Sequence, residues 1–131
     1  MEFLNVLVAA IASFAAGAVW YMRLADPWME AAGVQKGPDG KPANSADPRP
    51  YIVGFLATLL VAGMMRHVFA LGGIDTLGEG LVSGFGIGLF LAAPWLVTNY
   101  SFAGRPIRLM LIDGGYSTLG CTVIGFVLTL F

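Results

Sequence analysis

The chain has 131 residues, of which 57% are hydrophobic and 11% are charged, and its formal net charge at pH 7 is −1. Soluble domains carry about 25% charged residues, so this composition excludes an ordinary soluble fold. The small net charge and the scattered Lys and Arg residues also exclude a basic surface for nucleic acid.

Four apolar runs follow one another along the chain, at residues 3–22, 51–71, 80–97 and 109–131. Each run is close to the ~20 residues that an α-helix needs to cross a bilayer. The first run lacks a basic leader and ends in Trp20, Tyr21 and Arg23, unlike a cleaved signal peptide. We therefore predict one domain, residues 1–131, that is an all-α integral membrane bundle of four transmembrane helices.

The connections between these runs differ in length. The first loop, residues 23–50, is long, and within it Asp26 is expected to cap a short helix that begins at Pro27 and lies on the membrane surface. Gly and Pro break any regular structure over residues 36–50. The other two connections are short, which predicts antiparallel neighbours and hence two helical hairpins.

The distribution of basic residues predicts the orientation. Six of the seven Lys and Arg residues belong to the first and third loops or to the adjoining helix ends, and only Arg66 lies toward the other side. Cytoplasmic loops are enriched in Lys and Arg. We therefore expect a multi-pass protein of the bacterial inner membrane, with loops 23–50 and 98–108 in the cytoplasm and both termini outside.

Small residues recur at four-residue spacing in every predicted helix, as Ala9, Ser13 and Gly17; Gly54, Thr58 and Ala62; Gly80, Gly84 and Gly88; and Ser117, Cys121 and Gly125. Helices in lipid associate where small side chains let backbones approach closely. These rows predict helix-packing faces within the bundle. The alternative is that the row of Gly80, Gly84 and Gly88 faces a helix of a partner.

Arg66 and His67 are ionisable residues near the outer end of the second predicted helix. Arg66 is expected to extend toward Asp75, Glu79 or Glu2 and form a structural ion pair. The alternative is a site for an anionic headgroup, a quinone oxygen or a proton. One histidine cannot supply both axial ligands of a haem, and we expect no cofactor, no metal site and no catalytic residues.

Asp113 is expected near the start of the fourth helix, where a carboxylate interacts favourably with the helix dipole. The structural interpretation pairs it with Arg105 or Arg108. The alternative is a binding pocket for a proton or another ligand, formed by Asp113 with Asn99 and Tyr100.

Several fragments together resemble a known family. They are Asn5, Gly17 followed by Trp20 and Tyr21, Trp28, and the segment 102–106 that leads into residues 112–116. In order and spacing the chain resembles the DUF1761 family of small bacterial membrane proteins of unknown function. The resemblance implies a four-helix inner-membrane protein and supplies no reaction; Arg66 and His67 are outside its pattern.

Two classes of function follow from these observations. The favoured one is a structural accessory protein, not an enzyme, that packs through its small-residue faces in the lipid membrane. Its partner would be other transmembrane subunits, such as those of a respiratory or photosynthetic complex, or a second copy. The alternative is a small transporter or a bundle that binds a lipid, a quinone or a proton. Transporters place polar groups at broken helices near the midplane, and the predicted helix centres are apolar or small.

Overall fold

The computed structural model describes residues 2–131, which fold into helices and connecting loops. In chain order the helices are α1 (Glu2–Arg23), α2 (Ala25–Ala32), α3 (Arg49–Gly72), α4 (Leu77–Ile87), the π-helical turn η1 (Gly88–Ala92), α5 (Ala93–Phe102) and α6 (Ile107–Leu128). Four helical segments are long and apolar enough to cross a membrane: α1, α3, the continuous segment 77–102 and α6. The predicted helical architecture is confirmed.

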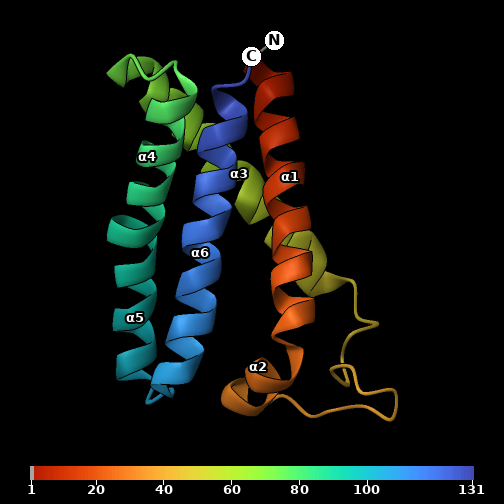
Figure 1. The fold of residues 1–131 in the computed structure, drawn as a ribbon. Helices are drawn as coiled ribbons and strands as arrows, with labels where there is room; N and C mark the ends of the chain where they lie inside the picture. The colour runs from red at the N-terminus through yellow and green to blue at the C-terminus, as the bar shows by residue number, and fades with distance from the viewer. Residues whose placement is uncertain (1) are drawn as a thin grey trace.

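The last helix, α6, is at the centre of the bundle. Half of its apolar window is buried, against 17–28% for the other three spans. Figure 1 shows α6 between α1 on one side and α4 and α5 on the other, with α3 passing behind. Both chain ends lie at one end of the bundle, and α2 with the long loop lies at the opposite end (Figure 1). Neighbouring spans run antiparallel, as the short loops predict.

The central position of α6 depends on small residues. A β-carbon added to Gly88 would lie 2.5 Å from Cα of Thr118, and one added to Gly84 would lie 3.1 Å from Cα of Thr122. Gly80 faces the backbone of Gly125 in the same way. The glycine row of α4, which continues to Gly88 at the start of η1, therefore packs inside the bundle. It faces the row on α6 that contains Ser117, Cys121 and Gly125.

The opposite side of α6 packs on α1. Ser13 and Gly17 are buried there, and a β-carbon on Gly17 would lie 2.6 Å from the ring of Tyr116. The remaining core joins α1, α3 and α6 and consists of Ala9, Ala10, Ala62, Met65, Phe69, Cys121, Ile124, Val127 and Leu128. The fully buried residues of α3 all belong to its second half. Its first half contacts α1 through Phe55, which meets Phe14 edge to face, and its other side is exposed.

Helix ends differ from the predicted bounds. The third span begins at Leu77 rather than residue 80, because Thr76 and Glu79 form a reciprocal capping box. It continues to Phe102 rather than 97. The last helix begins at Ile107, two residues earlier than predicted, and ends at Leu128.

The short helix in the first loop is present, but Asp26 does not cap it. α2 begins at Ala25, and no side chain caps its first turn. The backbone continues almost directly from α1, because Trp28 N–H donates to the carbonyl of Leu24. Asp26 instead pairs with Lys36 at 2.8 Å.

Candidate functional site

Asp113 lies in the second turn of α6, because that helix already begins at Ile107. The carboxylate is therefore not at the helix end, and it does not pair with Arg105 or Arg108 as expected. Arg105 donates to the backbone carbonyl of Ala32, and Arg108 lies 3.8 Å from Glu30. Both guanidinium groups instead tie the end of the bundle to α2, and the predicted ion pair of Asp113 is wrong.

Two tyrosines hold the Asp113 carboxylate. The hydroxyl of Tyr21 on α1 donates to Oδ1 at 2.7 Å, and the hydroxyl of Tyr100 on α5 donates to Oδ2 at 2.6 Å. The Asp113 residue is only 9% exposed. Three spans, α1, α5 and α6, thus meet at one buried carboxylate, which we call the Tyr–Asp–Tyr cluster (Tyr21, Asp113 and Tyr100).

Aromatic rings surround the cluster and position Tyr21. The Tyr21 ring meets Trp28 of α2 and Tyr116 of α6 edge to face, with centroid distances of 5.9 and 5.4 Å. The indole N–H of Trp20 donates to the carbonyl of Ile112 at 2.9 Å. Gly115 permits this contact, because a β-carbon there would lie 2.7 Å from the Trp20 ring. The rotation of α1 against α6 is therefore set by neighbouring aromatic contacts.

A π-helical turn precedes the segment that carries Tyr100. In η1 the N–H of Ala93 bonds to the carbonyl of Gly88, five residues earlier, and Pro94 follows directly. Each residue turns an α-helix by about 100°, so the wider turn changes the face on which Tyr100 lies. π-turns are frequent at functional sites, and this one packs against α6 beside the cluster, with Ala93 next to Gly114.

Of the predicted pocket residues, the structure brings together Asp113 and Tyr100. Asn99 is exposed, and its side chain makes no hydrogen bond within the described residues 2–131. The sequence identified Tyr21 only as part of the end of the first apolar run and did not predict its contact with Asp113. The only available signal was that Tyr21 and Asp113 lie at the same predicted end of the bundle.

Arg66 and His67 lie at the other end of the bundle and do not form a joint site. Arg66 donates to the carbonyl of Leu128 at 3.1 Å, and His67 is exposed. Asn5 also donates to the carbonyl of Leu128, at 3.2 Å, and to that of Phe131, at 2.7 Å.

Arg66 and Asn5 therefore cap the last turn of α6, where backbone carbonyls lack helical partners and a cation is favourable. The expected ion pair of Arg66 with Asp75, Glu79 or Glu2 is wrong. Glu79 instead accepts the backbone N–H groups of Asp75 and Thr76.

Within residues 2–131 no group of three His, Cys, Asp or Glu side chains could hold a metal ion. The model of a family of proteins of unknown function (DUF1761) matches residues 4–129, nearly the whole chain. No curated protein and no solved structure matches the chain.

Proposed function

Because the chain belongs to the DUF1761 family of proteins of unknown function, we propose its role from the geometry: it is a small membrane-spanning bundle that binds a proton or a small cation at Asp113. The observation that carries this proposal is a charge imbalance. The carboxylate is buried, and its hydrogen-bond partners are two neutral phenols.

An uncompensated carboxylate is costly inside a membrane protein, so an ionisable residue there is a functional candidate by default. Tyr21, Tyr100 and the nearby Tyr116 carry no positive charge, and the two nearest arginines in sequence, Arg105 and Arg108, contact α2 instead. A proton or a small cation would neutralise the charge. Because the cluster joins α1, α5 and α6, its occupancy would also change how these helices hold together.

Asp113→Asn tests the proposal because asparagine keeps the shape and one acceptor oxygen. Infrared spectra of the protein with ¹³C-labelled aspartate would be recorded in bilayers at about pH 7, where exposed aspartates are ionised. We expect a protonated-carboxyl band that is absent from the folded Asp113→Asn variant. Loss of the band at fixed pH when sodium or potassium chloride replaces choline chloride would identify a metal cation as the competing ligand.

A band that is the same in the parent and in Asp113→Asn would contradict the proposal, provided that no salt changes it. In that case Asp113 remains ionised and only links helices.

An accessory subunit is the second candidate, and the first half of α3 favours it. Four large apolar side chains are 54–76% exposed there, namely Ile52, Val53, Leu56 and Leu60. In a membrane, either lipid or a partner helix would cover them. The glycine row of α4 is not available to a partner, because α6 fills it. This role would be favoured by another membrane protein that copurifies in mild detergent and that no longer does so with the Leu60→Trp variant. If the partner is a second copy of the chain, the protein is a homo-oligomer.

We also propose an inner-membrane orientation with loops 23–50 and 98–108 in the cytoplasm, because basic residues favour that side. Native Cys121 is buried, so a new exposed cysteine can report sidedness. Asn44→Cys should resist an impermeant maleimide in intact cells and react after lysis, whereas Asp75→Cys should react in intact cells. The reverse pattern would invert the orientation.

A further inference from the structure

We propose that a groove between α1 and α6 binds one anionic phospholipid, with its phosphate on Arg23 and an acyl chain along the apolar wall. The groove has a volume of about 500 Å³ and is lined by Ala16, Val19, Trp20, Arg23, Leu24 and Leu119. It is separate from the Tyr–Asp–Tyr cluster and does not depend on the function proposed for that cluster.

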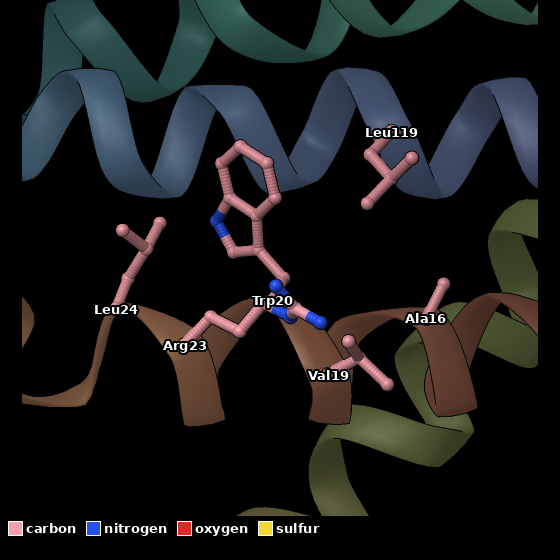
Figure 2. A pocket seen from close by; sticks show the side chains of 6 residues that line it. All are labelled: Ala16, Val19, Trp20, Arg23, Leu24 and Leu119. Atoms are coloured by element: carbon pink, nitrogen blue, oxygen red, sulfur yellow. The ribbon is translucent and has the colours of Figure 1, made fainter.

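The first argument is charge complementarity. Among the five arginines, all of which lie within the described residues 2–131, Arg23 alone has neither an ion pair nor a hydrogen bond from its side chain. Arg49 pairs with Asp47, Arg108 with Glu30, and Arg66 and Arg105 donate to backbone carbonyls. Figure 2 shows the Arg23 side chain running along α1 toward Trp20. The free guanidinium beside the groove favours an anion.

The second argument is the direction of the groove. Arg23 is in the last turn of α1, at the end of a membrane span, whereas Ala16 and Leu119 lie further toward the middle of the bundle. Between Ala16 and Leu24 the helical rise gives about 12 Å of apolar wall. A phospholipid has the same arrangement, because its charged phosphate lies at the interface and its acyl chain runs along the helices.

The third argument distinguishes a lipid from a partner helix. Ala16, Trp20 and Leu24 form a row at four-residue spacing, and two of these three side chains are large. Close helix association in lipid needs small residues at such positions. The indole N–H of Trp20 is already bonded to Ile112, so the Trp20 side chain offers the groove its apolar ring. A flexible acyl chain fits this uneven surface better than a second backbone does.

Quenching of Trp20 tests the proposal, because brominated acyl chains quench tryptophan on contact. Trp28→Phe and Trp95→Phe leave Trp20 as the single tryptophan in vesicles of phosphatidylcholine. A small fraction of brominated phosphatidylglycerol should quench Trp20 as strongly as about five times that fraction of brominated phosphatidylcholine. This is the preference that one arginine near an anionic lipid is expected to give.

Arg23→Gln should remove this preference, whereas the matched control Arg108→Gln at the same end of the bundle should keep it. Ala16→Phe fills the groove and should reduce quenching by both lipids. Equal quenching by the two lipids in the parent would overturn the proposal, as would a preference that survives Arg23→Gln. Loss of the preference when inorganic phosphate replaces chloride at equal ionic strength would also overturn it, because the site would then bind free anions.

Discussion

Gly84→Leu should prevent α4 from packing on α6 and should lower the free energy of unfolding by about 3 kcal/mol or more. A β-carbon at Gly84 would lie 3.2 Å from the carbonyl carbon of Cys121 and would overlap its oxygen. Both are backbone atoms and cannot rotate away, so the two helices must separate. The loss would extend along the whole glycine row, because Gly80 and Gly88 pack on the same helix.

Gly86→Leu is the matched control, because it makes the same change two residues further along α4. A β-carbon at Gly86 meets nothing within 4 Å, and leucine has the higher helix propensity by about 0.8 kcal/mol. The stability of this variant should equal or slightly exceed that of the parent. Unfolding in detergent, followed by circular dichroism, compares the two. Equal melting of the Gly84 and Gly86 variants would show that the α4–α6 contact is not held by close backbone approach.

The sequence predicts the spans and packing faces well because both depend on local composition. Apolar length defines each span, and small residues at four-residue spacing identify the sides on which α4 and α6 meet. The missed helix ends have local signals as well. Thr76 and Glu79 have the spacing of a capping box, and the polar residues 98–100 continue the third span because their backbone bonds remain helical.

The Tyr–Asp–Tyr cluster is less predictable, because it depends on helix rotation. Tyr21 and Asp113 are 92 residues apart in sequence, and their contact depends on the fit of Trp20 against Gly115. The position of Tyr100 depends on the π-helical turn before Pro94, which no periodic pattern in the sequence reveals. The arginine partners assigned to Asp113 were wrong because α2 folds back under α6 and supplies Glu30 and the Ala32 carbonyl as alternatives.

The combined variant Tyr21→Phe with Tyr100→Phe should lower the free energy of unfolding by about 4 kcal/mol. In the ionised form of Asp113, hydrogen bonds to the charged group contribute about 1.5–3 kcal/mol each, and both donors to the buried carboxylate would be lost. Each phenylalanine keeps the ring and its packing. Tyr51→Phe is the control, because the Tyr51 hydroxyl donates at 3.1 Å to the carbonyl of Ser45 in an exposed position, and its loss should change stability little.

Adding Asp113→Leu to the two phenylalanines should restore most of the lost stability. Replacing both members of a buried hydrogen bond by apolar groups is nearly neutral, whereas leaving one unsatisfied costs its desolvation. The comparison of single, double and triple variants therefore measures the penalty of the carboxylate itself. If the triple variant were no more stable than the double variant, the tyrosine hydroxyls would contribute through packing alone. Recovery of stability in the triple variant would instead show that the bundle tolerates an apolar residue at position 113. The native aspartate would then lower stability without being needed for packing.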